Sequence, residues 1–167
     1  MPAIRDFLDE LEQEADGTKR TLERVCNQKL TWKPHEKSLS LGQLALHIAT
    51  LPGALAEISM LPAFDAATVI PRPEAKNVDE LLAAHAASIT RAREILGGMD
   101  DAALETPWTI VMGSKEIARM PRGQFLRSVL FNHWYHHRGQ LTVYLRETGA
   151  LVPAIYGPSA DEVPFQM

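Results

Sequence analysis

The hydrophobic positions of this chain recur at steps of three and four residues, which is the period of amphipathic α-helices. Over residues 3–26 the apolar side chains are separated by Asp and Glu, and this pattern predicts a first helix with one apolar face. Ser40 is a suitable N-cap for a second helix that ends near Met60. The apolar face of this second helix carries His47, and Pro52 predicts a local distortion in its middle.

Two further helices and one hairpin follow from the same pattern. Asn77 or Asp79 is the expected N-cap of a third helix, which ends at the glycine pair 97–98. The longest helical pattern covers residues 123–148 and is followed by another glycine. Residues 106–121 have β-forming side chains on both sides of a Gly-Ser pair, which predicts a short hairpin.

The segments between these elements have no sustained period. Residues 29–40 are expected to be a connection, residues 61–77 a loop, and the proline-rich residues 150–167 an extended cover. We find no internal repeat and no convincing sheet. The pattern therefore predicts an all-α fold, an antiparallel four-helix bundle with long loops and one short hairpin, in a single domain over residues 1–167.

Composition and charge argue against a nucleic-acid partner, a secreted protein and a membrane protein. The 167 residues are 46% hydrophobic and 23% charged, which is ordinary for a globular protein with a sizeable core. The net charge of −4 argues against a nucleic-acid partner, which requires a basic surface. Cys26 is the only cysteine, and the acidic start of the chain differs from a signal peptide. Polar residues interrupt the apolar region 39–70, so we expect no membrane span and a cytoplasmic protein.

The segment NHWYHHRGQL, residues 132–141, holds three of the six histidines. Residues four apart on an α-helix differ by about 40° in azimuth and about 6 Å in rise, so His133 and His137 project from one face. A single cation can bridge these two rings. His136 diverges from His137 by about 100°, so the three rings do not converge easily. Imidazole is a ligand for zinc, nickel, copper and iron, and a productive site usually needs a third protein ligand.

His47 is the candidate third ligand, because inward-facing residues of different helices meet in the core of a bundle. The alternative is that His47 is a hydrogen-bonded core residue without a metal, and the same alternative applies to His85. His35 follows a proline and is expected to be exposed. No acidic residue follows His133 in the manner of the H-E-x-x-H motif, so the metalloprotease mechanism has no base here.

Three separated segments carry a resemblance to a known family. LTWKPHEKSLSLGQLALHIA, NHWYHHRGQLTVYLRETG and VPAIYGPSADE resemble, in this order, the DinB/YfiT-like family of small bacterial metal-binding proteins, which is distinct from the DNA polymerase of the same name. The resemblance implies an up-down-down-up four-helix bundle, homodimers, and a divalent metal, commonly zinc or nickel, held by three histidines. Position by position, these histidines correspond to His47, His133 and His137, while His136 falls at a variable position.

The resemblance also bears on function, since relatives include transferases and isomerases that use mycothiol or bacillithiol. Three neutral imidazoles leave the charge of a divalent cation uncompensated, so a bound water or thiol would lose a proton near neutral pH. The leading hypothesis is a metal-dependent enzyme, a thiol-dependent transferase or isomerase or a hydrolase, that acts on a small electrophile with a low-molecular-weight thiol as cosubstrate. Two alternatives stay open: a non-catalytic metal-binding or sensing module, and a metal-free helical interaction domain.

Five other residues are candidates for supporting roles. Gln43 and Gln140 lie one turn from candidate ligands and are expected either to orient them or to act as solvated or capping residues. Cys26 would close the site as a fourth ligand, but its place near the end of the first helix favours packing as a small hydrophobe. Tyr156 either brings its phenol near the metal or forms a hydrophobic clasp. Arg138 is expected to pair with an acidic residue or to anchor the tail.

Overall fold

The computed structural model describes residues 3–68 and 70–163, so the last four residues of the expected tail and domain lie outside the described part. The protein is mostly helical with a small three-stranded sheet, which confirms the predicted predominance of helix. In chain order the elements are α1 (Ile4–Leu22), η1 (Asn27–Lys29), α2 (Leu41–Met60), β1 (Ala63–Asp65), α3 (Val78–Gly97), α4 (Asp101–Glu105), β2 (Pro107–Met112), β3 (Lys115–Pro121), α5 (Arg122–Phe125), η2 (Leu126–Phe131) and α6 (Asn132–Glu147).

Side-chain caps fix the starts of α2 and α3. Ser40 Oγ accepts a hydrogen bond from the Gln43 amide at 3.1 Å, and the Ser40 amide donates to Gln43 Oε1 at 3.0 Å, which forms a reciprocal capping box. Asn77, not Asp79, caps α3 by accepting from the Glu80 amide at 2.8 Å. Both helices therefore begin where the sequence predicts.

The first helix ends earlier than predicted, at Leu22 rather than at residue 26. The amides of Arg24 and Val25 donate to carbonyls three residues back instead of four, so the chain tightens into 3₁₀-type turns before it reaches η1. Cys26 consequently lies outside α1, at the start of η1.

The predicted hairpin is present as β2 and β3, which pair antiparallel and are joined by a two-residue turn in which Gly113 adopts φ 59°. The sheet is larger than predicted. β1, which lies in the segment expected to be a loop, pairs parallel with β2. The short helix α4 was also not predicted, although Asp100 caps it by accepting from the Ala103 amide at 2.8 Å.

The last long helical segment is continuous from Arg122 to Glu147, close to the predicted residues 123–148, but it is not α-helical throughout. Residues Leu126–Phe131, directly before the histidine segment, form the π-helical turn η2. A π turn holds more residues per turn than an α turn, so it changes the direction in which the following side chains point. The faces of α6 are therefore set by the helix after η2, not by a single period from residue 123.

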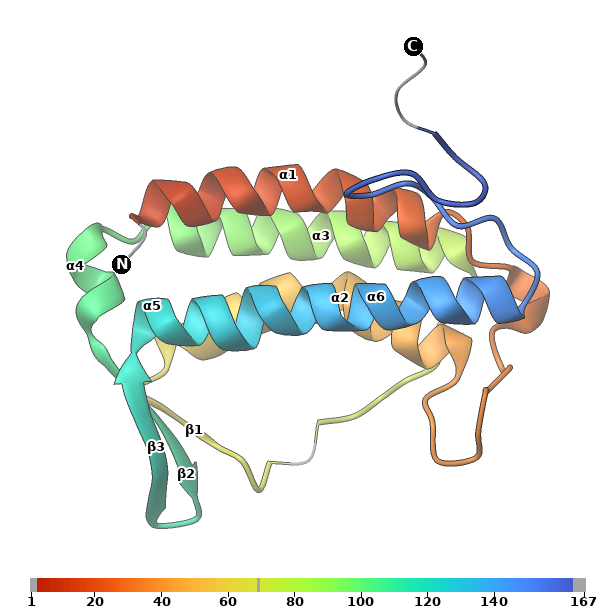
Figure 1. The fold of residues 1–167 in the computed structure, drawn as a ribbon. Helices are drawn as coiled ribbons and strands as arrows, with labels where there is room; N and C mark the ends of the chain where they lie inside the picture. Colours follow the sequence, from red (N-terminus) through yellow and green to blue (C-terminus); the bar gives the residue numbers. More distant parts are fainter. Residues whose placement is uncertain (1–2, 69, 164–167) are drawn as a thin grey trace.

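The long helices α1, α2, α3 and α6 lie side by side (Figure 1). The chain runs along α1, returns along α2, crosses back through the segment before α3, runs along α3 in the direction of α2, and returns along α6. α2 approaches α3 closely, since a Cβ atom at Gly53 would lie 3.0 Å from the Ser88 carbonyl oxygen and 3.1 Å from its Cα. The largest fully buried side chains belong to Trp108, Trp134, Phe7, Phe125 and Phe131.

Among the described residues, α2 is the one helix that is long and apolar enough to cross a membrane. The polar residues in the region 39–70 were expected to rule out a membrane-spanning helix. By length and composition alone, this expectation is wrong for α2. In the structure, however, 56% of its most apolar stretch is buried against the rest of the protein. A buried core helix satisfies the same criteria, so the apolar sequence of α2 is accounted for by packing on its neighbours.

Candidate metal centre

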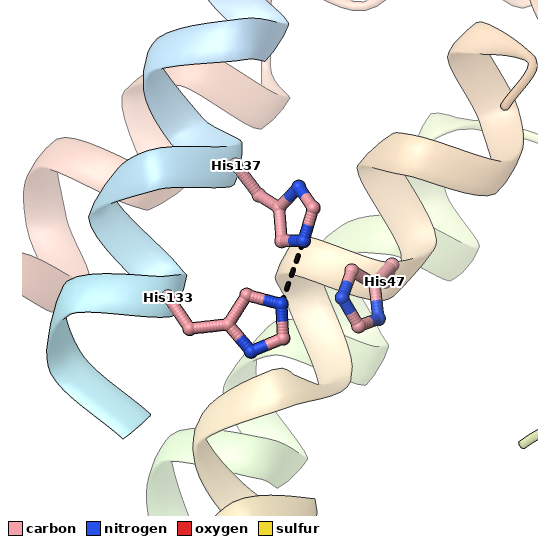
Figure 2. Close-up of side chains that lie close together, drawn as sticks. All are labelled: His47, His133 and His137. Carbon is pink, nitrogen blue, oxygen red and sulfur yellow. Dashed lines mark hydrogen bonds between the residues drawn. The ribbon is translucent and has the colours of Figure 1, made fainter. Parts of the chain in front are cut away.

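His47 on α2 and the pair His133 and His137 on α6 point toward one another (Figure 2). The ligand nitrogens of the three rings all lie within 4.8 Å of one another. The ring centroids are 5.4 Å apart for His47 and His133, 4.7 Å for His47 and His137, and 4.5 Å for His133 and His137. The structure thus brings together the three histidines that the sequence singled out.

The helical positions of these residues explain why they meet. His133 and His137 are half-buried and lie one turn apart on α6, beside the fully buried Trp134. His47 is half-buried on α2, next to the fully buried Ile48. Because α2 packs against α6, side chains at the edge of each buried face meet where the two helices come together.

The protonation state of the cluster favours metal binding. Burial is the main cause that lowers the pKa of His47 to about 3, that of His133 to about 4, and that of His137 below its ordinary value. The positive charge of Arg72 lowers the pKa of all three rings further, while a hydrogen bond to Gln140 partly opposes the effect at His137. His47 and His133 are therefore neutral at neutral pH, the form in which imidazole offers a lone pair to a cation.

The two candidate supporting glutamines have different roles. His137 Nδ1 donates to Gln140 Oε1 at 2.7 Å, which leaves Nε2 of His137 directed toward the cluster. Gln140 is therefore the residue that orients a histidine. Gln43 is instead the capping residue of α2, and its Nε2 donates to the Arg72 carbonyl at 3.0 Å. The capping alternative for Gln43 is confirmed.

The other histidines and the cysteine lie outside this group of residues. His136 is exposed, and its ring contacts His137 edge-on with a centroid distance of 5.1 Å. His85 is a buried core residue whose Nε2 lies 3.0 Å from the Ala15 carbonyl, and His35 is exposed, as expected. Cys26 is half-buried, and its thiol donates to the side chain of Gln28 at 2.9 Å rather than only packing as a hydrophobe.

Tyr156 and Arg138 belong to a separate polar cluster between α1, α6 and the tail. The buried Arg138 guanidinium pairs with Glu14 and also donates to Thr18 Oγ1 at 3.1 Å. The Tyr156 hydroxyl donates to Glu14 at 2.8 Å and accepts from Arg138. Arg138 thus does both things expected of it. Neither expectation for Tyr156 is correct, because its phenol is held by a buried ion pair and serves as a polar clasp on α1.

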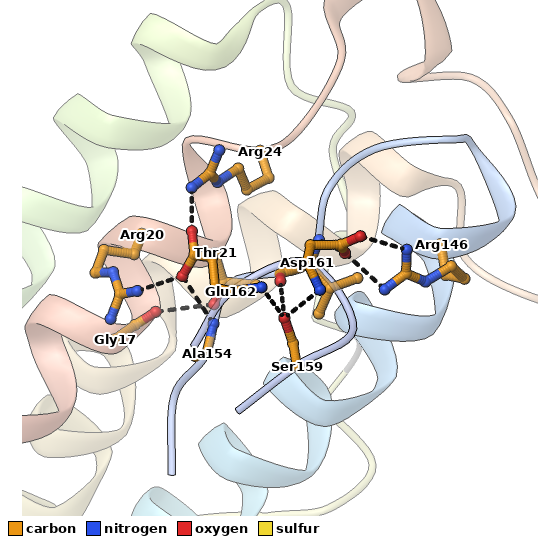
Figure 3. A network of polar contacts seen from close by, with 10 residues as sticks. Gly17, Arg20, Thr21, Arg24, Arg146, Ala154, Ser159, Asp161 and Glu162 are labelled. Atoms are coloured by element: carbon orange, nitrogen blue, oxygen red, sulfur yellow. Dashed lines mark hydrogen bonds and ion pairs between the residues drawn. The ribbon is translucent and has the colours of Figure 1, made fainter. Parts of the chain in front are cut away.

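The rest of the tail is fastened to the same two helices (Figure 3). Glu162 pairs with Arg20 and Arg24 of α1 and accepts from the Ala154 amide at 2.9 Å. Asp161 pairs with Arg146 of α6 at 2.6 Å. The described tail is therefore the extended cover that the sequence predicts, but ion pairs hold it on α1 and α6.

A cavity of about 530 Å³ opens between α2 and the segment that follows β1, and His47 and His133 form part of its wall. Arg72 also lines it, whereas most of the remaining wall consists of apolar side chains such as Leu55 and Phe64. This volume lies within the range of about 300–1,000 Å³ that is usual for small-molecule sites. Sequence reasoning missed the cavity and Arg72, because residues 61–77 show no period from which their path could be predicted.

The three histidines fit a divalent cation. His47 Nε2 is one of three buried side-chain polar atoms in the described part of the chain that have no hydrogen-bond partner, and a cation would satisfy it. Ligand nitrogens of a tetrahedral zinc ion lie about 3.3 Å apart. In the cluster, the Nε2 atoms of His133 and His137 are 2.7 Å apart, and all ligand nitrogens lie within 4.8 Å of one another. Three neutral imidazoles suit zinc, nickel or copper better than magnesium or calcium.

Comparison with known proteins agrees with this fold. The DinB family model matches residues 1–164. The uncharacterized protein YrdA of Bacillus subtilis (strain 168) is 31% identical over an alignment of 166 positions, and the alignment covers 93% of this chain and 89% of YrdA. The crystal structure of a DinB-like protein from Bacillus cereus ATCC 10987 superposes with a TM-score of 0.72 at 26% identity, over 92% of this chain and 98% of the other.

A second crystal structure, of the DinB-like protein YjoA from Bacillus subtilis, superposes with a TM-score of 0.67 over 90% of this chain and 96% of YjoA. At 19% identity this similarity concerns the fold alone. The family match and the relative at 31% identity, each over most of the chain, together show that the protein belongs to the DinB family.

Proposed function

We propose that this chain binds a divalent metal ion, zinc or nickel, through His47, His133 and His137, and that it is a metal-dependent enzyme. The observation that carries the proposal is the convergence of three imidazole rings from two helices, with their ligand nitrogens within 4.8 Å of one another. The low pKa values of His47 and His133 support it, because both rings are neutral and able to bind a cation.

A divalent cation held by three neutral ligands lowers the pKa of a bound water or thiol toward neutrality, so it supplies a nucleophile. The side chains around it have separate tasks. Gln140 fixes the orientation of His137, and the apolar wall of the cavity excludes water from a small electrophile bound beside His47 and His133. These features support a thiol-dependent transferase or isomerase, or a hydrolase, with a low-molecular-weight thiol as cosubstrate in the first two cases.

The proposal also covers the helical architecture, the oligomeric state, the compartment and the partners of the protein. The arrangement in Figure 1 supports an up-down-down-up four-helix bundle in a single domain. We propose a cytoplasmic homodimer that acts on a small-molecule substrate and has no nucleic-acid or membrane partner. Sedimentation of the purified protein tests the dimer directly.

Elemental analysis of protein purified without an affinity tag tests the metal site. We expect about one zinc or nickel ion per chain, lost in His47→Ala and in His137→Ala because a site of two imidazoles binds weakly. His136→Ala is the matched control, since it removes an exposed histidine next to the cluster and should retain the metal. Retention of stoichiometric metal by His47→Ala would overturn the assignment.

Turnover is tested separately with the metal-loaded protein, a low-molecular-weight thiol and a chromogenic aryl chloride as electrophile, followed by absorbance. We expect thiol-dependent turnover that His137→Ala abolishes and His136→Ala retains. If the protein holds stoichiometric metal but turns over none of a series of aryl chlorides, the result would instead support the non-catalytic metal-binding module.

A further inference from the structure

The apolar cavity beside the histidines has a composition that metal binding alone does not require. On one side its wall is a face of α2 that includes Leu51, Ala54 and Leu55. On the other side it includes Phe64 of β1. A site that only activates water needs no apolar wall of this extent. Apolar surface of a ligand gains free energy when it leaves water for such a wall, so the ligand is expected to have an apolar part.

Arg72 adds a single positive charge to this cavity. Arg72 lines the cavity together with His47 and His133, and its carbonyl accepts a hydrogen bond from Gln43 of α2. Arg72 is an exposed residue, and no carboxylate in residues 3–68 or 70–163 lies within ion-pair distance of its guanidinium. A guanidinium in this situation is suited to a carboxylate, which it can bind through two parallel hydrogen bonds.

We propose that the cavity binds a small carboxylate amphiphile, with its carboxylate at Arg72 and its apolar chain or ring along α2. This inference deepens the proposed function by naming the class of its substrate, and it rests on that function only in placing the reacting part of the ligand beside the histidines. Binding itself depends on the apolar wall and on Arg72, so it is measurable in metal-free protein.

Calorimetric titration with octanoate, hexanoate and neutral octanol provides the test, with both metal-free and zinc-treated protein. We expect saturable binding of octanoate to one site per chain. If both additional methylenes are buried, octanoate should bind about fifteenfold more tightly than hexanoate. Arg72→Gln should weaken octanoate binding by about fivefold, as expected for an exposed ion pair, and should leave octanol binding unchanged.

Two matched variants test whether binding occurs in this cavity. Ala54 is an exposed residue of α2 that lines the cavity, so Ala54→Phe fills the space without entering the core. Ala87 is an exposed residue of α3 outside the cavity wall, so Ala87→Phe adds the same side chain elsewhere. We expect Ala54→Phe to abolish binding of octanoate and octanol, and Ala87→Phe to change neither.

The outcomes separate this inference from the metal assignment. Octanoate binding that depends on Arg72 and Ala54, in protein that takes up no zinc, supports the cavity and overturns the metal site. Zinc uptake without saturable octanoate binding supports the metal site and overturns the cavity as a carboxylate-binding site. Equal effects of Arg72→Gln on octanoate and octanol overturn the role of the carboxylate, and octanoate binding that survives Ala54→Phe overturns the location.

Discussion

Acidification from about pH 7.5 to about pH 5.5 is expected to weaken zinc binding by no more than about tenfold. At about pH 5.5 a histidine with an ordinary pKa of about 6.5 is about nine-tenths protonated, so three such ligands would weaken binding by about a thousandfold. Burial lowers the pKa of His47 to about 3 and that of His133 to about 4, so both stay neutral at this pH. The pKa of His137 is lowered as well, so protonation of His137 should weaken zinc binding by less than the about tenfold expected for a histidine with an ordinary pKa.

The same pKa shifts have a consequence for the metal-free protein. A histidine whose pKa is lowered by folding binds fewer protons in the folded state than in the unfolded state at intermediate pH. Its contribution to stability is therefore complete above about pH 6.5 and declines as the pH falls, to about pH 4 for His133 and about pH 3 for His47. Circular dichroism at each pH must confirm that the protein is folded, so that loss of zinc binding is not confused with unfolding.

The assay is calorimetric titration of zinc into tag-free protein that has been stripped with a chelator and dialysed. His136→Ala is the control, because it removes the exposed imidazole that would bind zinc weakly next to the cluster. A loss of a hundredfold or more at about pH 5.5, in protein that remains folded and also in His136→Ala, would refute the reasoning that burial keeps the ligands neutral.

Three further predictions concern single substitutions. Gln140→Leu removes the hydrogen bond that orients His137 and should weaken zinc binding by about 10- to 100-fold in the same titration, with no change in the circular dichroism spectrum. Gly53→Ala places a methyl group within 3.1 Å of the α3 backbone and should lower the free energy of unfolding by about 1–3 kcal/mol in urea denaturation; an unchanged midpoint would contradict this. Arg138→Met removes the ion-pair partner of Glu14, whose side chain is 9% exposed and keeps only the hydrogen bond from Tyr156; it should cost about 3–5 kcal/mol at neutral pH, much of it recovered by adding Glu14→Leu.

The sequence allowed the long helices and the histidine cluster to be predicted because both depend on local spacing. The pair His133 and His137 follows from one helical turn, and the face that holds His47 follows from the apolar period of α2. The resemblance to the DinB family added the pairing of the two helices, which no local pattern contains. The convergence of the three rings in the structure agrees with both arguments.

Other features depend on contacts between distant residues and were missed for that reason. β1 is short and finds its partner β2 far along the chain, so its own sequence carries little strand signal. Arg72 lies in the same irregular segment, and only the folded path of that segment places it beside the histidines. The π turn η2 was also not predicted, because the apolar positions of residues 123–148 fit a single helical period. Asp100, by contrast, is a recognisable N-cap, so α4 has a local sequence signal, although a helix of five residues is too short to show an apolar period.

The cavity is built from two kinds of wall, and this division bears on how the site can diverge in evolution. The histidines and one apolar side belong to α2 and α6, where a substitution of a buried residue disturbs the packing of the core. The opposite side is an irregular segment at the surface, where residues can be exchanged, inserted or deleted at small cost to the fold. Descendants of a common ancestor can therefore keep the histidine cluster and change the lining of the cavity by changing the segment between β1 and α3.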